Sequence, residues 1–128
     1  MGGPRNALLV DDTPINVKLL AALLKANGFA VTIATTGESA LELVKTAAFE
    51  LVLLDLRLPG IDGLTVARTL RADPQYQHLA IVAVSASAMK HDVAAALDAG
   101  CDAFVSKPIN TRTLIPMLVG LLARRAAS

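Results

Sequence analysis

The segment LVLLDLRLPGIDGLTVARTL, residues 51–70, predicts one complete strand–loop–helix unit. Its first four residues are apolar at consecutive positions, a pattern typical of a strand covered on both faces in a parallel sheet. Asp62 stands where a helix N-cap is expected, before apolar residues at helical spacing that stop ahead of Asp73-Pro74. The segment therefore places Asp55 at the point where a buried strand ends.

Four more short apolar runs lie before and after this unit, and each is followed by a segment of helical periodicity. They are residues 7–10, 30–34, 80–84 and 103–105. Five β–α units in series imply right-handed crossovers between parallel strands. We therefore predict an α/β fold: a doubly wound, five-stranded parallel sheet flanked by five helices, in the flavodoxin-like strand order 2-1-3-4-5.

Residues that commonly begin and end helices set the limits of the other helices. The expected limits are Thr13-Pro14 and Gly28 for the first helix, a Thr35/Glu38 capping box before residues 41–48 for the second, Met89 and Ala99 for the fourth, and a start after Asn110 for the fifth. Pro116 falls inside the fifth helix and would remove one backbone hydrogen bond. We expect a bend or a delayed start there.

Composition predicts a single domain with a substantial core. The 128 residues are 54% hydrophobic and 18% charged, and their mean hydropathy is +0.54. We assign residues 6–123 to the domain and residues 1–5 and 124–128 to flexible termini. The net charge is only +1 and no block of Lys and Arg occurs, so direct binding of nucleic acid is not expected.

Neither a membrane span nor a disulfide is expected. The longest uncharged apolar run, residues 114–123, is far shorter than the ~20 residues that a membrane-spanning helix needs. The first five residues lack the apolar stretch of a signal peptide. The single cysteine, Cys101, is interpreted as a small buried side chain, and the chain is expected to be cytoplasmic.

Three carboxylates follow the predicted strands at one edge of the sheet. Asp11 and Asp12 follow the first strand, and Asp55 ends the third. In a doubly wound sheet the ligand site lies beyond the carboxyl ends of the strands, where the strand order reverses. Three acids together repel each other, and Mg²⁺, which prefers oxygen ligands, would relieve this repulsion. The alternative interpretation is that they are only helix caps and loop residues.

Two further polar residues are expected at the same edge. Ser85 ends the fourth strand and Lys107 follows the fifth. A lysine can pair with a carboxylate or a phosphoryl oxygen, and a hydroxyl can donate to another such oxygen. These five side chains predict a site for transfer of a phosphoryl group to a carboxylate.

These residues carry a resemblance to a known family. The Asp11-Asp12 pair, residues 55–63, Ser85-Ala86 and Lys107-Pro108 resemble the receiver domain of bacterial two-component response regulators, and the similarity extends over residues 6–123. Residues 12–20 and Met89-Lys90 are similar to two groups in particular. These are stand-alone cell-division receivers of the DivK type and the receivers of hybrid histidine kinases.

The resemblance implies a role for each site residue. Asp55 would be the phosphoacceptor, and the ammonium group of Lys107 would bind the phosphoryl group. The peptide bond between Lys107 and Pro108 would be cis. For Mg²⁺, the implied ligands are Asp12 directly, Asp11 mainly through water, Asp55 itself, and the backbone carbonyl of Arg57.

The resemblance also implies a conformational switch. Ser85 and Phe104 would form the switch pair, in which the aromatic ring turns into space that the serine leaves. The alternative for Phe104 is a plain core residue.

The resemblance predicts one partner, and the apolar character of the fifth helix predicts a second contact. A histidine kinase or a histidine phosphotransfer protein would donate the phosphoryl group and dock near Ile15, Asn16 and Lys18, although Ile15 could instead be a buried staple residue. The fifth helix is apolar on all sides, which suggests a second cover for its outer face. We expect a homodimer or a partner contact through the surface of helix 4, strand 5 and helix 5.

Three alternative functions differ from the receiver interpretation. A phosphatase of the haloacid-dehalogenase kind has an Asp-x-Asp nucleophile on its first strand and often a cap domain, whereas Asp11 and Asp12 are adjacent. A flavodoxin-like cofactor binder is poorly supported, because the loops carry carboxylates and the chain has only four aromatic residues. The third alternative, that the chain is a receiver module detached from a hybrid histidine kinase, is compatible with the same residues. We expect a signalling receiver, not an enzyme that turns over substrate.

Overall fold

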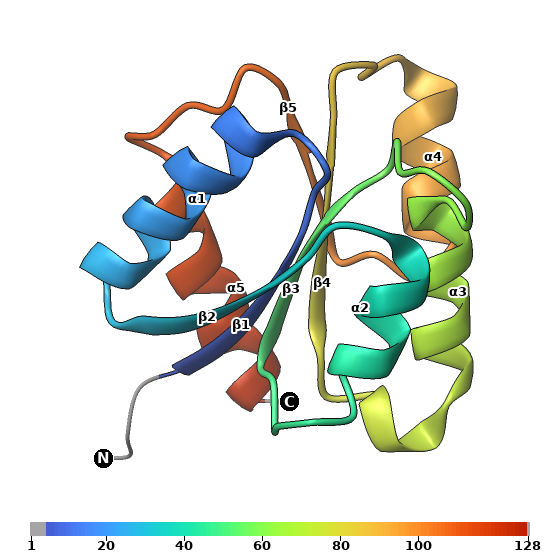
Figure 1. Cartoon of the computed structure of the whole chain (residues 1–128), viewed down its shortest axis with the longest axis horizontal. Helices are drawn as coiled ribbons and strands as arrows, with labels where there is room; N and C mark the ends of the chain where they lie inside the picture. The colour runs from blue at the N-terminus through green and yellow to red at the C-terminus, as the bar shows by residue number, and fades with distance from the viewer. Residues whose placement is uncertain (1–4, 128) are drawn as a thin grey trace.

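The computed structural model describes residues 5–127, which form a single α/β unit (Figure 1). The strands are β1 (Arg5–Val10), β2 (Phe29–Ala34), β3 (Leu51–Asp55), β4 (Ala80–Ser85) and β5 (Ala103–Ser106). The helices are α1 (Pro14–Ala26), α2 (Gly37–Leu43), α3 (Gly63–Ala72), α4 (Lys90–Asp98) and α5 (Leu114–Ala127), with a short 3-10 helix, η1 (Pro74–Tyr76). Residues 1–4 and 128, which belong to the termini expected to be flexible, lie outside the described residues.

The sheet has the predicted topology. Its strand order is β2-β1-β3-β4-β5, and every pair is parallel. β1 pairs with β2 on one side and with β3 on the other, so the strand order reverses at β1 and β3. Val10 is the register partner of Leu54, which brings the carboxyl ends of these two strands side by side.

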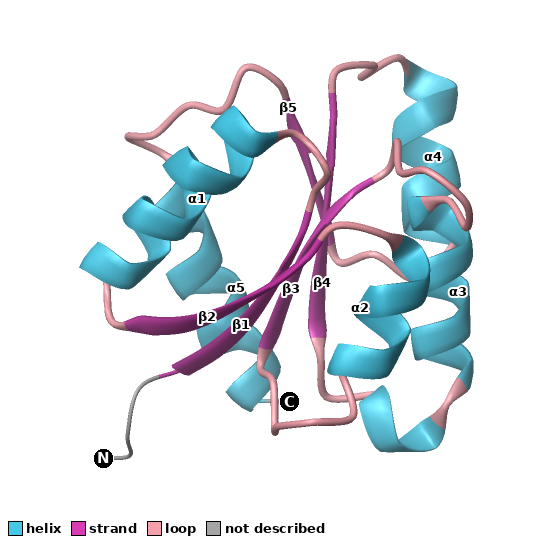
Figure 2. Ribbon diagram, viewed as in Figure 1, coloured by secondary structure: helices cyan, strands magenta, loops and turns pink. Residues whose placement is uncertain are grey.

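Helices cover both faces of the sheet, as Figure 2 shows: α1 and α5 lie on one face, and α2, α3 and α4 lie on the other. Consecutive residues of β3 therefore enter different cores, with Leu53 packed on the α1–α5 side and Leu54 on the α2–α4 side. Both side chains are fully buried. This two-sided burial is the physical reason why the strands are apolar at consecutive positions.

The second helix differs from the prediction in both its start and its end. Thr36, not Thr35, is the N-cap, and the capping box pairs it with Ser39: the Ser39 N–H donates to Thr36 Oγ1 at 3.0 Å. The helix ends at Leu43 instead of continuing to residue 48, because the Thr46 hydroxyl and N–H both donate to the Leu43 carbonyl. The expected box was wrong by one residue, since serine can also occupy the third helical position.

The fifth helix has the predicted delayed start. It begins at Leu114, so Pro116 is its third residue, where a backbone N–H would have no partner within the helix in any case. Its end lies further along than expected, because residues 124–127, assigned to a terminus, are helical. Arg125 holds this last turn, donating to Asp102 at 2.6 Å, and Asp102 also pairs with Arg71 of α3.

Candidate functional site

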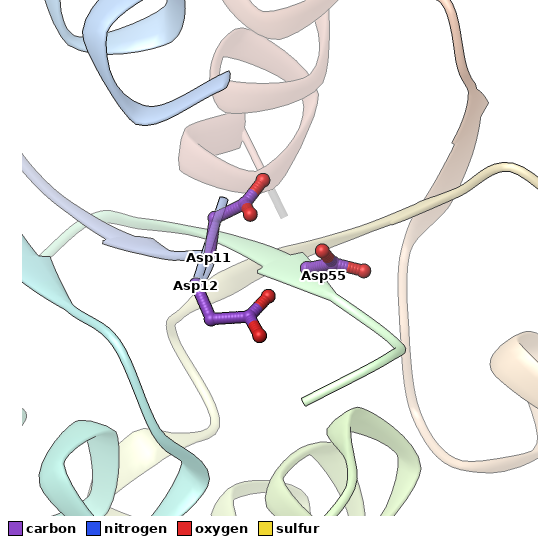
Figure 3. A group of neighbouring side chains, drawn as sticks. All are labelled: Asp11, Asp12 and Asp55. Carbon is purple, nitrogen blue, oxygen red and sulfur yellow. The ribbon is translucent and has the colours of Figure 1, made fainter. Parts of the chain in front are cut away.

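The ends of β1 and β3 bring the three predicted carboxylates together. Asp11 and Asp12 follow the last residue of β1, and Asp55 is the last residue of β3. Carboxylate oxygens of the three side chains all lie within 4.8 Å of one another, and Figure 3 shows the three side chains gathered at these strand ends. The cluster expected from strand order is therefore present in the structure.

The three acids differ in how far they are buried. Asp11 and Asp55 are 1% and 4% exposed, whereas Asp12 is exposed at the rim. Burial is the main cause that raises the pKa of Asp11, and the nearby Asp55 carboxylate raises it further. The Thr13 N–H, which donates to Asp11 Oδ1 at 2.9 Å, and the Lys107 ammonium act in the opposite direction. The acids thus repel one another, and one cation only partly compensates.

Lys107 supplies that cation. Its ammonium group donates to Asp55 Oδ2 at 3.0 Å and lies 3.8 Å from Asp11 Oδ2. Its backbone N–H donates to the Ser85 carbonyl, and its peptide bond to Pro108 is cis, as expected from the resemblance. Lys107 is therefore placed to neutralise charge that accumulates on Asp55.

The second oxygen of Asp55 also has a partner. The Arg57 N–H donates to Asp55 Oδ1 at 2.9 Å, in the loop that follows β3. Both carboxylate oxygens of Asp55 are thereby held in place by hydrogen bonds, which orients the carboxylate. Arg57 is adjacent to the cluster, as predicted, and the ligand role of its carbonyl oxygen stays a prediction.

The two residues of the expected switch pair lie on neighbouring strands, Ser85 on β4 and Phe104 on β5. Ser85 ends β4 with a side chain 4% exposed, and its Oγ accepts a hydrogen bond from the Ser87 N–H at 3.1 Å. Phe104 is half-buried and packs against the core on the α2–α4 side of the sheet. It also lines a cavity of about 290 Å³ together with Pro108 and Met117. The ring therefore has both a core contact and open space next to it.

One hydrogen bond near the site was not predicted from the sequence. The Ser87 hydroxyl donates to Asp92 Oδ2 at 2.6 Å, and this bond is the main cause that lowers the pKa of Asp92. Asp92 is also the acceptor for the Met89 N–H at the start of α4. The sequence does contain a signal for the bond between Asp92 and the Met89 N–H. Asp92 lies three residues after the expected helix start, at the N3 position from which an acid can bond back to the N-cap N–H.

The chemistry of the donor set fits a magnesium ion. All three clustered side chains offer carboxylate oxygens, the ligands that this ion prefers, and no histidine or cysteine takes part. The exposed position of Asp12 leaves the cluster open to water and to an incoming ligand. Within the described residues, Asp11, Asp12 and Asp55 are the one group of this kind that could hold a metal ion.

An apolar groove adjoins the site along α1. A space of about 650 Å³ lies between α1 and β2 and is lined by Asp12, Pro14, Val17, Lys18, Ala21, Ala22, Lys25, Ile33 and Thr35. Ile15 is 75% exposed on the same helix, so its interpretation as a buried staple residue is wrong. Of the predicted docking residues, Ile15 and Lys18 are exposed and Asn16 is half-buried, and Lys18 lines the groove together with Asp12.

The outer surface of α4 and α5 is partly apolar. Leu97 and Val119 are 50% and 45% exposed, while Leu114, Leu118 and Leu121 form the buried stripe of α5. In the part of the chain that the structure describes, no helix is long and apolar enough to cross a membrane.

Comparison with known sequences supports the resemblance seen in the motifs. A family model described as the response regulator receiver domain matches residues 7–119. The chain is 34% identical to the polar-differentiation response regulator DivK of Brucella anthropi over 119 residues, which are 93% of this chain and 97% of that protein. It is 33% identical to DivK of Brucella ovis over 118 residues, 92% of this chain and 96% of that protein.

Solved structures give the same picture. A CheY-like response regulator receiver domain protein from Methanospirillum hungatei superposes with a TM-score of 0.90 at 25% identity, covering 98% of each chain. The receiver domain of a sensor histidine kinase from Pseudomonas aeruginosa, crystallised with a magnesium ion coordinated in its active-site cleft, gives a TM-score of 0.86 at 30% identity. That match covers 95% of this chain and 99% of the other. The predicted family resemblance and fold are confirmed.

Proposed function

The chain belongs to the response regulator receiver domain family, and from this we propose that it is a phosphoacceptor switch that takes a phosphoryl group from phosphohistidine on Asp55. The observation that carries the proposal is the ion pair between the buried Asp55 and Lys107, at 3.0 Å, beside two further acids. A signalling role for this family member, without turnover of an external substrate, is part of the proposal.

The transfer itself requires a carboxylate nucleophile in a fixed orientation. An oxygen of Asp55 attacks phosphorus, a bond between oxygen and phosphorus forms, and the bond between phosphorus and the donor imidazole nitrogen breaks. The imidazole nitrogen leaves with the electron pair. The Arg57 N–H and the Lys107 ammonium hold the two oxygens of Asp55, which reduces the cost of positioning the nucleophile.

Asp11, Asp12 and Asp55, with the Arg57 carbonyl, would hold the Mg²⁺ that this acidic cluster fits. When bound, the ion supplies positive charge that offsets the repulsion between the acids and the phosphoryl oxygens. Lys107 adds a second positive charge at Asp55, where negative charge increases during transfer. Asp12, the exposed acid of the three, is the one whose removal leaves the buried part of the site unchanged.

Ser85 and Phe104 would convert phosphorylation into a change of surface. The Ser85 hydroxyl donates to a phosphoryl oxygen on Asp55, and Phe104 turns into the space that Ser85 leaves. Such a change shifts an equilibrium between two conformations of the α4–β5–α5 surface. The exposed side chains of Leu97 and Val119 support a homodimer or partner contact there. Light scattering with and without phosphorylation tests the homodimer, and a monomer in both states would exclude it.

A histidine kinase or a histidine phosphotransfer protein is the proposed donor. The groove beside α1 runs along Val17, Lys18 and Ala21 and reaches Asp12 at the rim of the site. A partner helix seated there would be close to Asp55, which supports docking of the donor on this face. A phosphotransfer profile against candidate kinases would identify the donor.

The proposed function is tested by labelling with a small phosphodonor in the presence of Mg²⁺. The wild-type chain is expected to take one phosphoryl group that is lost in acid or hydroxylamine, as acyl phosphates are. Asp55→Asn should abolish this labelling, whereas Asp62→Asn, which changes an exposed acid that caps α3, should retain it. Undiminished labelling of the Asp55 variant would refute the assignment. Continuous release of phosphate from phosphate esters would favour the phosphatase interpretation instead.

A further inference from the structure

Three hydrogen bonds connect the phosphorylation pocket to the start of α4. The Ser87 N–H donates to Ser85 Oγ at 3.1 Å, and the Ser87 hydroxyl donates to Asp92 Oδ2 at 2.6 Å. The same Asp92 oxygen accepts the Met89 N–H at 3.2 Å. Ser87 is thus the one residue of this connection that contacts both the site and the helix.

The first turn of α4 depends on this connection. Its N-cap residue, Met89, has no side-chain oxygen, and no hydrogen bond from a side chain at that position caps the helix. Asp92 instead reaches back to the Met89 N–H, and Ser87 holds the Asp92 carboxylate from the loop. A helix start without a capping oxygen of its own is weakened when such a contact is lost.

The other end of the connection is fixed by the sheet. The Ser85 carbonyl accepts the Lys107 N–H, and the Val84 carbonyl accepts the Leu56 N–H directly after Asp55. The backbone of β4 is therefore held on both sides, so a displacement of the Ser85 hydroxyl reaches the following loop through the hydrogen bond that the hydroxyl accepts from Ser87. Ser87 is the first residue of that loop to bond to the hydroxyl.

The loop has room to move. A cavity of about 180 Å³ lies between this loop, α4 and the loop after β3, and Ser85, Ser87 and Asp92 all line it. Close packing would resist a shift of Ser87, since interiors without voids transmit strain instead of absorbing it. Space for a shift of the Ser87 side chain is therefore present beside it.

We propose that Ser87 and Asp92 are positioning residues that transmit the state of Ser85 to the first turn of α4. The proposal rests on the proposed function, because a phosphoryl group on Asp55 is what draws the Ser85 hydroxyl toward Asp55. As the hydroxyl moves, its contact with the Ser87 N–H is lost, Ser87 shifts, and its hydroxyl releases Asp92. The first turn of α4 then opens more often, at the edge of the proposed partner surface.

Amide hydrogen exchange in the full chain, with and without a small phosphodonor and Mg²⁺, measures this effect. The amides of Asp92 and Val93, which both donate to the Met89 carbonyl, report the first turn. We expect phosphorylation of the wild type to accelerate their exchange about fivefold, the size of a lost helix cap. In Ser87→Ala the exchange should already be fast, and phosphorylation should change it no further.

Two more variants separate the connection from a general loss of stability. Ser39→Ala removes the hydroxyl that accepts the Thr36 N–H in the capping box of α2, a comparable bond on another helix, and should retain the wild-type response at Asp92 and Val93. Ser87→Thr keeps a hydroxyl at the same position and should restore the response. Both variants, like Ser87→Ala, should take the phosphoryl label to the wild-type extent.

The outcomes distinguish the two proposals. If Ser87→Ala is labelled normally and its Asp92 and Val93 amides still respond like those of the wild type, the connection through Ser87 is overturned while the phosphoacceptor role stands. If the wild-type chain takes no label, the proposed function fails first, and the connection fails with it.

Discussion

The ammonium group of Lys107 lies 3.0 Å from Asp55 Oδ2, although the two residues are 52 positions apart in the chain. The contact joins the end of the central strand β3 to the loop after the edge strand β5. It places the compensating cation on the residue proposed to receive the phosphoryl group. The proposed chemistry of the site depends on this ion pair.

Removal of the cation should slow phosphorylation. Lys107→Ala leaves the buried Asp55 and Asp11 carboxylates without their positive neighbour, so negative charge that develops during transfer is less well stabilised. We expect the labelling rate from a small phosphodonor to fall by about 10- to 100-fold. Lys45→Ala, which changes a lysine with a 64% exposed side chain, is the matched control. Equal rates for the two variants would contradict the role of Lys107.

Magnesium binding should depend on the exposed acid. Asp12→Asn removes one charged oxygen donor without disturbing buried contacts, so the free energy of unfolding should stay nearly constant. The affinity for Mg²⁺, measured by calorimetry, should fall at least about tenfold. Asp98→Asn, at the exposed end of α4, should bind Mg²⁺ like the wild type. An unchanged affinity of the Asp12 variant would remove it from the ligand set.

The position of Asp55 should be sensitive to one glycine. A Cβ on Gly63, the first residue of α3, would lie 2.6 Å from the Asp55 carbonyl oxygen and 2.7 Å from Leu56 Cα. These contacts are with backbone, so Gly63→Ala must displace the end of β3. We expect a loss of about 1–3 kcal/mol of unfolding free energy, measured in urea, together with slower labelling.

Gly120 provides the control for this prediction. In α5 a Cβ at this position would meet only a guanidinium nitrogen of Arg124, at 3.8 Å. Gly120→Ala should therefore be neutral or stabilise the chain by up to about 1 kcal/mol, as expected for alanine in a helix. A Gly63→Ala variant as stable as Gly120→Ala would show that the contact with β3 is not tight.

Cys101 should make stability depend on alkaline pH. Burial raises the pKa of the Cys101 thiol from 9.0 to about 11. Its contribution to stability is complete below pH 9 and is lost as the pH rises through 11, because the unfolded thiol ionises first. The wild type should lose about 2 kcal/mol more unfolding free energy than Cys101→Ala across this interval. Parallel pH profiles of the two proteins would contradict the burial of the neutral thiol.

The fold and the five side chains of the site follow from local sequence signals. Leu51 to Leu54 are apolar at consecutive positions because alternate residues enter the cores on opposite faces of the sheet. Once the strand order is known, Asp11, Asp12 and Asp55 must meet at the reversal point. Short-range patterns and one topological rule therefore suffice to locate the cluster.

Other features depend on neighbours distant in the chain and could not be predicted in the same way. The last turn of α5 is held by a contact between Arg125 and Asp102, which are 23 residues apart. The sequence around Arg125 contains no pattern that predicts Asp102 as its partner. The predicted capping box of α2 differs from the observed one by one residue, because Thr35 and Thr36 are both suitable N-caps. Glu38 lies instead against the loop at Gly60, where its oxygens would contact an added Cβ.

The assignment of Asp55 can be checked by identifying the residue that carries the phosphoryl group. After transfer from a phosphorylated histidine donor, borohydride reduction converts an acyl phosphate on aspartate to homoserine, and peptide mass spectrometry locates it. We expect homoserine at position 55 in the wild type, and none in a sample that received no phosphoryl group. Homoserine at another acid, or a label that resists reduction, would contradict the assignment of Asp55 as the phosphoacceptor.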